Sequence, residues 1–173
     1  LNDLEYRRRI SFVFQDPLLL DMSVRENVAL GLKFRGLRGE EIRRRVDQWM
    51  KQLGIESLAK RRAGQISGGE AQRISLARAF VLEPELLLLD EPFSALDPPT
   101  RSNLLDELSA LLRRDRRTAI FVTHNLNEAA RLSQRIAIII KGRLMQVGPA
   151  RQIKGKPVNA EVAAFLKELT QAL

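Results

Sequence analysis

Two adjacent carboxylates directly follow a run of four leucines. Leu86 to Leu89 form the run, and Asp90, Glu91 and Pro92 come immediately after it. A buried strand that ends in two acidic side chains is costly unless a cation lies beside them. Mg²⁺ bound to a nucleotide is such a cation, because one carboxylate can hold the metal while the next orients or deprotonates the water that attacks a phosphoryl group. A solvated acidic turn before a proline is the alternative, and the pair alone leaves it open.

A second candidate is the start of a predicted helix, where Ser67 is followed by Gly68, Gly69 and Glu70. Small residues in the first turn let backbone N–H groups approach an anion, and the helix dipole and the Ser67 hydroxyl favour negative charge there. Ordinary N-capping explains Ser67 and Glu70 equally well, because Ser-x-x-Glu is a capping box, but it does not need paired glycines. Both interpretations stay open at this point.

Two further polar side chains come directly after apolar runs. His124 is the only histidine in the sequence, and Gln15 precedes an Asp-Pro pair. Each residue by itself is more typical of a structural or surface position. In open α/β sheets, however, ligands bind outside the carboxyl ends of the strands. We therefore expect His124, Gln15, Asp90 and Glu91 to converge on one edge of one sheet.

Short apolar runs alternate with helical patterns along most of the chain. Non-alternating runs predict buried parallel strands at 10–14, 86–89 and 119–122. Amphipathic spacing and capping signals predict helices at 23–32, at 40–53, at 67–83, from Pro98 with Asp97 as its cap, and from Asn125. The fold class is therefore α/β, with helices layered on a parallel sheet.

The end of the chain follows a different pattern. Two apolar segments, 135–140 and 143–147, flank Lys141-Gly142 and predict a β-hairpin. Residues 160–169 predict a closing helix with Val162, Phe165, Leu166 and Leu169 facing inward.

Composition limits the classes of function. The 173 residues, 45% hydrophobic and 29% charged, suit one compact domain and argue against disorder. No cysteine is present, which excludes thiolate metal sites and cysteine nucleophiles. The net charge of +8 would suit phosphate-bearing partners, but aromatic residues make up only 5%, too few for stacking platforms on single-stranded nucleic acid. The longest apolar runs are far shorter than the roughly 20 residues that cross a bilayer.

Five linked motifs occur in a recognisable order. They are FQD at 14–16, ISGGEAQR at 66–73 followed by LARA at 76–79, LLLLDEP at 86–92, SALD at 94–97 and VTH at 122–124. Together they resemble the nucleotide-binding domain of ATP-binding-cassette (ABC) transporters, over nearly the whole chain. Two positions depart from the commonest form, because Ile66 replaces leucine and Glu70 stands where glutamine is usual.

The resemblance implies a P-loop NTPase-like parallel sheet core with an α-helical subdomain. It implies that the subdomain occupies about residues 16–64, that the core from the signature motif to the switch histidine occupies 65–134, and that a C-terminal hairpin and helix occupy 135–173.

The resemblance also implies a catalytic set. Glu91 matches the catalytic base, and His124 matches the switch histidine that touches the γ-phosphate of ATP. Asp90 matches the Mg²⁺-associated aspartate, and Gln15 matches the Q-loop glutamine that contacts Mg²⁺ or the attacking water. ATP and Mg²⁺ are the cofactors that follow from this set.

A second group of residues matches positions that meet a neighbouring subunit. Ser67, Gly68, Gly69 and Glu70 match the signature motif, which in the family closes over the γ-phosphate bound to the opposite subunit. Asp97 matches the D-loop aspartate at the dimer interface. The implied partner is a second copy of the chain, in a homodimer.

One expected motif is missing from the sequence. Phosphate cradling in this class needs Gly-x-x-x-x-Gly-Lys-Ser/Thr, and no such string is present. In the family this loop precedes the Q-loop, so we expect the first strands and the P-loop to lie upstream of Leu1. We accordingly expect the chain alone to bind ATP poorly and not to hydrolyse it.

The implied function is the ATP-hydrolysing subunit of a bacterial or archaeal ABC importer. Such a subunit lies at the cytoplasmic face of the cell membrane, bound to a transmembrane permease, with no nucleic acid partner. One alternative is a non-transport ABC ATPase that acts on DNA or ribosomes, although these usually carry coiled-coil insertions or duplicated cassettes. Another is a noncatalytic fragment that self-associates through an uncovered sheet edge or apolar face.

Overall fold

The computed structural model describes residues 2–171, which divide into two compact units between Ile120 and Phe121. The first unit holds α1 (Asp3–Arg8), β1 (Ile10–Val13), α2 (Val24–Phe34), α3 (Gly39–Gln52), two 3₁₀ turns (Glu56–Leu58 and Ala63–Gln65), α4 (Gly68–Phe80), β2 (Leu86–Asp90) and α5 (Pro98–Arg114). Strand β3 (Thr118–Val122) crosses the boundary. The second unit holds α6 (Leu126–Leu132), β4 (Ile136–Ile140), β5 (Arg143–Gly148), α7 (Ala150–Gly155) and α8 (Ala160–Gln171).

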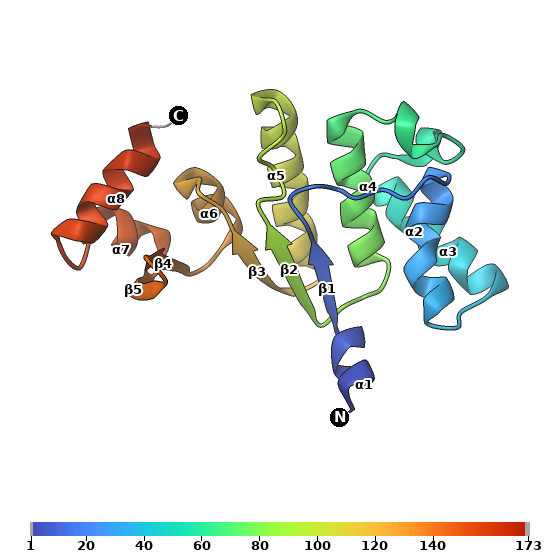
Figure 1. The fold of residues 1–173 in the computed structure, drawn as a ribbon, viewed down its shortest axis with the longest axis horizontal. Helices are drawn as coiled ribbons and strands as arrows, with labels where there is room; N and C mark the ends of the chain where they lie inside the picture. Colours follow the sequence, from blue (N-terminus) through green and yellow to red (C-terminus); the bar gives the residue numbers. More distant parts are fainter. Residues whose placement is uncertain (1, 172–173) are drawn as a thin grey trace. The chain divides into compact units, whose positions relative to one another are not determined.

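A parallel sheet forms the centre of the first unit. Its strand order is β1-β2-β3, and β1 pairs with β2 in parallel from Ile10 opposite Leu86 to Val13 opposite Leu89. The connection between these two strands runs through α2, α3 and α4 (Figure 1). The predicted α/β class is confirmed, and the predicted strands differ from the observed ones by one residue at their ends.

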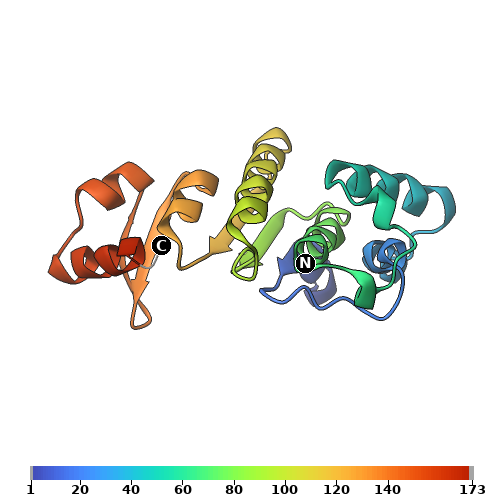
Figure 2. The ribbon, with the colours of Figure 1, turned by 90° about the horizontal axis from the view of Figure 1, so that it is seen from above.

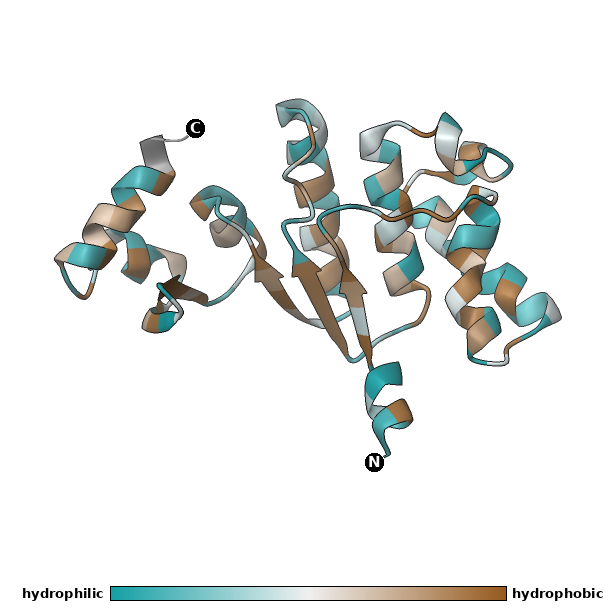
Figure 3. Ribbon diagram, in the orientation of Figure 1, coloured by the Kyte–Doolittle hydropathy of each residue, from teal (hydrophilic) through white to brown (hydrophobic). Residues whose placement is uncertain are grey.

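The sheet is buried on one face only, which corrects the prediction of strands buried on both faces. Val13, Leu87 and Leu89 are buried, whereas Phe12 and Phe14, which alternate with Val13 along the chain, are 46% and 52% exposed. The rings of Phe12 and Phe14 lie 4.4 Å apart. Figure 3 shows that the strands are hydrophobic along most of their length. An apolar run predicts burial on both faces only where helices cover both faces, and here the helices of the first unit cover one.

Helices α2 and α3 lie beside α4, on the side away from α5, in both ribbon views (Figures 1 and 2). The ring of Trp49 in α3 stacks on that of Phe80 in α4, with centroids 4.8 Å apart. Gly31 in α2 lets the chain approach Leu82, because a Cβ there would lie 2.8 Å from the Leu82 Cδ2. These contacts pack the helical segment against the helix that begins after Ser67.

The helix starts predicted from capping residues agree with the structure better than the helix ends predicted from apolar periodicity. Ser23 caps α2 in a capping box with Glu26, as predicted. Helix α4 ends at Phe80, three residues before the predicted Glu83. Glu83 precedes a proline and has a φ of 51°, so it cannot continue a helix. Helix α1 was not predicted, although Asn2 and Glu5 form a capping box at its start.

The second unit has its own small core. Strands β4 and β5 pair antiparallel, which confirms the hairpin, with an irregularity between Ile138 and Ile139. Ile138, Ile153 and Val162 are buried together with residues of α6 and α8. The closing helix is confirmed, whereas α7 was not predicted. Among residues 2–171, no helix is long and apolar enough to cross a membrane.

Candidate functional site

The acidic pair stands where β2 ends. Asp90 is the last residue of the strand, and Glu91 leaves it with a φ of 45°, in the left-handed region that non-glycine residues avoid. The backbone N–H and the hydroxyl of Ser94 both donate to the Glu91 carbonyl oxygen, at 3.2 and 3.0 Å. This turn offsets a backbone cost of about 1–2 kcal/mol. Both carboxylates are half-buried.

Gln15 follows the neighbouring strand at the same edge. Val13 lies opposite Leu89 in a parallel pair, so β1 and β2 end at the same edge of the sheet. Gln15, Asp90 and Glu91 are therefore at the shared carboxyl edge of β1 and β2, as expected for a ligand site in an α/β fold. Gln15 itself is exposed.

The donor atoms at this edge fit Mg²⁺. That ion takes oxygen ligands and is usually held by one or two protein side chains together with phosphate oxygens. The Asp90 carboxylate and the Gln15 amide oxygen are ligands of this type. No group of three or more His, Asp or Glu side chains that could hold a metal occurs among the described residues.

Ser67 and Glu70 form a capping box at the start of α4. The Ser67 backbone N–H and hydroxyl donate to the Glu70 Oε2, at 2.8 and 2.9 Å. The Glu70 N–H donates to the Ser67 Oγ at 3.4 Å. These hydrogen bonds, together with Arg61 at 4.0 Å, lower the pKa of Glu70. The capping interpretation therefore explains both side chains.

The two glycines of this turn differ in their surroundings. A Cβ on Gly69 would lie 2.9 Å from the Cγ2 of Thr100 in α5, so close packing of the two helices explains this glycine. A Cβ on Gly68 would meet nothing within 4 Å. Packing within the chain gives no reason for a glycine there, which leaves an open first turn that an anion could approach.

Asp97 caps α5 beside this turn. Its carboxylate accepts from the Thr100 N–H at 3.1 Å. Hydrogen bonds from the Thr100 side chain and from its backbone N–H lower the pKa of Asp97. Since Thr100 also faces Gly69, the structure brings the Ser67–Glu70 turn and Asp97 to neighbouring helix starts. Both Ser67 and Asp97 are exposed.

His124 lies in the second unit. It is exposed and precedes Asn125, which caps α6 by accepting from the N–H groups of Asn127 and Glu128. The Thr123 hydroxyl donates to Glu128 at 2.9 Å and fixes the turn. The predicted convergence of His124 with the acidic pair stays a prediction.

Comparison with known proteins gives a family. A family model described as "ABC transporter" matches residues 2–94. The chain belongs to the ABC transporter family. This confirms the resemblance that the five motifs carried.

Individual ABC relatives agree with this assignment. The solved structure of cbiO1 from Clostridium perfringens, part of the ABC transporter complex cbiONQ, superposes with a TM-score of 0.81 at 30% identity, covering 98% of this chain and 68% of that one. The molybdate/tungstate import ATP-binding protein WtpC of Thermococcus kodakarensis is 44% identical over 92% of this chain and 49% of its own length. The glycine betaine/proline betaine transport system ATP-binding protein ProV of Escherichia coli is 40% identical over 93% of this chain and 40% of its own.

A third ABC relative is the spermidine/putrescine import ATP-binding protein PotA of Mesorhizobium japonicum. It is 43% identical over 94% of this chain and 45% of its own length. The chain thus spans about half the length, or less, of these curated relatives.

Sequence reasoning on the ABC motifs missed two residues that contact the Gln15 segment. Asn27 was read only as part of a helix and Arg78 only as part of the LARA motif at 76–79, yet both reach backbone atoms of the segment after Gln15. One signal was available for Asn27, because asparagine is unfavourable within a helix unless its side chain makes hydrogen bonds. Arg78 lies in the LARA motif, but nothing in that motif indicates a contact with the segment after Gln15.

Proposed function

We propose that this chain is part of the ATP-binding subunit of an ABC importer, in which ATP hydrolysis drives solute uptake through a membrane permease. The observation that carries the proposal is the shared edge of β1 and β2, which groups Gln15, Asp90 and Glu91 in a chain of the ABC family. The relatives described as import ATP-binding proteins support the direction of transport.

The proposed catalytic roles follow the chemistry of the edge. Glu91 accepts a proton from the attacking water at its carboxylate, and its turn holds that carboxylate beyond the end of the strand. Asp90 and Gln15 supply oxygen ligands to Mg²⁺, which neutralises phosphate charge when it is bound. His124 donates a hydrogen bond to the γ-phosphate. This last role rests on the motif match alone.

The proposed second partner is another copy of the chain. Ser67, Gly68, Gly69 and Glu70 would close over the γ-phosphate held by that copy, with Asp97 at the same interface. The open first turn at Gly68 and the exposure of Ser67 and Asp97 support this role. A backbone N–H group at a helix start binds phosphate without any change in the fold.

The proposed subunit binds its permease at the cytoplasmic face of the membrane. In this arrangement residues 16–64 form the helical subdomain that meets the permease, residues 65–134 form the core, and residues 135–173 form the closing segment. The dense packing of α2 and α3 on α4 supports a path from the permease to the Ser67 turn.

The solute is selected elsewhere in the importer. Relatives described by molybdate/tungstate import, glycine betaine/proline betaine transport and spermidine/putrescine import match this chain at 44%, 40% and 43% identity. Anions, zwitterions and cations of such different chemistry cannot share one recognition site. Similar ATP-binding chains therefore serve different permeases.

Phosphate release by the complete subunit with its permease tests the proposal. We expect Glu91→Gln to lower turnover on the order of 100-fold or more, since it removes the proton acceptor while Mg-ATP binding persists. Glu168→Gln, at an exposed position of α8, serves as the control and should leave turnover unchanged. Normal turnover by Glu91→Gln would contradict the assignment of the base.

The 173 residues alone should behave differently. Because the sequence contains no Gly-x-x-x-x-Gly-Lys-Ser/Thr string, we expect weak Mg-ATP binding by calorimetry and no phosphate release. Saturable turnover that Glu91→Gln abolishes would show that these residues suffice for hydrolysis.

A further inference from the structure

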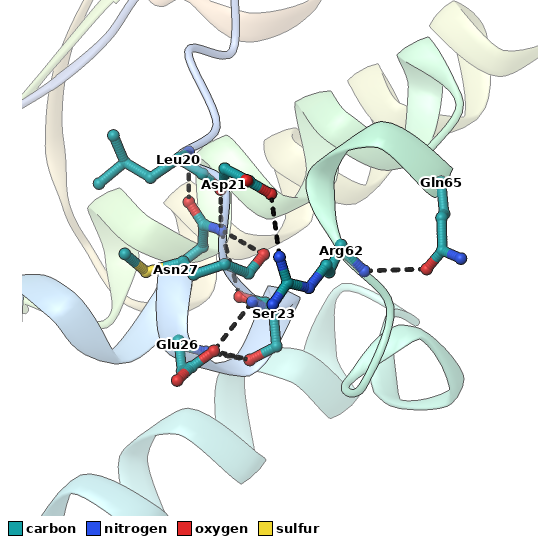
Figure 4. A network of polar contacts seen from close by, with 8 residues as sticks. Leu20, Asp21, Ser23, Glu26, Asn27, Arg62 and Gln65 are labelled. Carbon is teal, nitrogen blue, oxygen red and sulfur yellow. Dashed lines mark hydrogen bonds and ion pairs between the residues drawn. The ribbon is translucent and has the colours of Figure 1, made fainter.

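The backbone segment between Gln15 and α2 is held by one buried side chain. Asn27 is only 2% exposed, and its Oδ1 accepts from the Leu20 N–H at 3.0 Å. Its Nδ2 donates to the carbonyl oxygens of Leu20 at 3.0 Å, Met22 at 3.3 Å and Ser23 at 3.2 Å (Figure 4). Both the oxygen and the nitrogen of the Asn27 side-chain amide are therefore hydrogen-bonded to the backbone that leads into α2.

A second side chain reaches the same segment from α4. The Nη1 of Arg78 donates to the Leu18 carbonyl at 2.8 Å and to the Pro17 carbonyl at 3.3 Å. Leu18 has a φ of 46°, which a leucine avoids unless its surroundings enforce it. A partly buried guanidinium keeps its charge, so these two carbonyls also stabilise Arg78.

The segment is also tied to the residues that precede Ser67. Ser23 and Arg62 form an antiparallel bridge, and the Val24 N–H donates to the Arg61 carbonyl at 2.9 Å. Arg62 forms an ion pair with Asp21 at 3.5 Å (Figure 4). The chain after Gln15 is thus attached both to α4 and to the chain that leads into α4.

These attachments lie close to Gln15 in the sequence. Only Asp16 lies between Gln15 and Pro17, whose ring fixes its own φ and restricts the residue before it to extended conformations. A displacement of the Pro17 carbonyl therefore moves Gln15 with it.

We propose that Asn27 and Arg78 are positioning residues, which hold Gln15 at the sheet edge in a fixed relation to the Ser67 helix. The proposal rests on the proposed function, because that function supplies the role of Gln15. Neither residue touches the reacting atoms. Each acts on Gln15 through the backbone of residues 17–23.

Amide hydrogen exchange on the 173-residue chain tests the attachment itself. In Asn27→Ala, we expect exchange of the Leu20 amide and its neighbours to accelerate on the order of tenfold or more, with the amides of α5 unchanged. Arg78→Gln should accelerate exchange over the same segment. Asn103→Ala and Arg44→Gln change exposed helical positions and serve as matched controls. Unchanged exchange at residues 18–23 in both test variants would overturn the proposal.

Conservative variants cover the case in which a variant does not fold. Asn27→Asp keeps the acceptor for the Leu20 N–H but loses the donors to three carbonyls. Arg78→Lys keeps a cationic donor. We expect exchange rates at residues 18–23 in these two variants to lie between those of the unchanged chain and those of Asn27→Ala and Arg78→Gln. Rates equal to those of the unchanged chain in both conservative variants would contradict the proposed attachment.

Steady-state ATP hydrolysis by the complete subunit with its permease tests the link to Gln15. We expect Asn27→Ala to lower kcat on the order of tenfold, with KM for ATP nearly unchanged, because a misplaced group costs rate more than binding. In a Gln15→Ala background the same change should cause no further loss. If Asn27 has only a structural role, the fold-losses in kcat of Asn27→Ala and Gln15→Ala multiply in the double variant. That result would overturn the proposal.

The kcat values of Gln15→Ala and of the double variant distinguish failure of this proposal from failure of the proposed function. If Gln15→Ala leaves kcat unchanged, the role of Gln15 in the proposed function is wrong, and the positioning claim is overturned with it. If Gln15→Ala lowers kcat and Asn27→Ala lowers it further by the same factor in both backgrounds, only the positioning claim fails.

Discussion

Glu91 combines a strained backbone with a proposed chemical role that depends on the position of its carboxylate. Its φ of 45° ends β2 abruptly, and Ser94 holds the carbonyl of the strained residue. Strain of this kind persists only where the surrounding structure enforces it, and it concentrates at functional sites. The conformation thus agrees with the assignment of Glu91 as the base, which the motif suggested on other grounds.

The strain at Glu91 can be measured without its side chain. We expect Glu91→Gly to be more stable to urea unfolding than Glu91→Ala by about 1 kcal/mol, because only glycine adopts this φ freely. At the exposed helical position Asn103 the order should reverse, with alanine more stable than glycine by about 1 kcal/mol. Equal stability of the two Glu91 variants would show that the backbone there is unstrained.

The carboxylate of Glu70 makes a pH-dependent contribution to the start of α4. Hydrogen bonds from Ser67 lower its folded pKa, so its contribution is complete above the ordinary glutamate pKa of about 4.3 and is lost as pH falls through the lower folded value. We expect Glu70→Gln to flatten the acid side of a plot of unfolding free energy against pH. An unchanged slope below about pH 4 would contradict the capping role.

At the scale of elements, helix starts and strand positions were predictable because local chemistry decides them. Ser23, Ser67, Asp97 and Asn125 all cap the helices that they were predicted to begin. Such caps depend on residues three positions apart, and the sequence displays them directly. The end of α4 was predicted too late, because the turn at Glu83 depends on a positive φ that periodicity does not report.

The contacts between elements were not predictable in the same way. The bond from Arg78 to the Leu18 carbonyl joins residues 60 positions apart, and nothing in either local sequence specifies it. The same holds for Arg73, which pairs with Glu107 of α5 and donates to the Leu53 carbonyl after α3. Candidate site residues could therefore be found from motifs, whereas the residues that hold them in place required the fold.

The paired glycines give a test at the junction of α4 and α5. Gly69→Ala should be less stable than Gly68→Ala by about 1 kcal/mol, because its new Cβ meets the Thr100 Cγ2 and overpacks the helix contact. Thermal unfolding measures the difference, and Thr100→Ser should remove it by deleting the clashing methyl group.

Of the same two glycines, Gly68 should matter for function although its replacement hardly affects stability. Gly68→Ala should leave stability nearly unchanged but weaken ATP-dependent association of two complete subunits, measured by light scattering. If Gly68→Ala associates normally, the open first turn has no part in contacting the partner's nucleotide.

At the scale of the whole molecule, the exposed face of the sheet was the main departure from expectation. Apolar runs alone predicted burial of Phe12, yet burial depends on which layers are present, and strand sequence does not contain that information. The family, by contrast, was predictable from the order of five motifs, since each motif is chemically constrained. The relation of His124 to the acidic pair depends on the placement of the two units.

We propose above that Gln15 and Asp90 hold the metal of a bound nucleotide at the edge of β1 and β2. The most direct measurement is the paramagnetic broadening of backbone amide signals in the complete subunit loaded with Mn-ATP, with Mn²⁺ in place of Mg²⁺. We expect the amides of Gln15, Asp90 and Glu91 to broaden most, and Asp90→Asn to weaken the effect. Broadening centred away from this edge, with these three amides unaffected, would show that these side chains do not hold the metal.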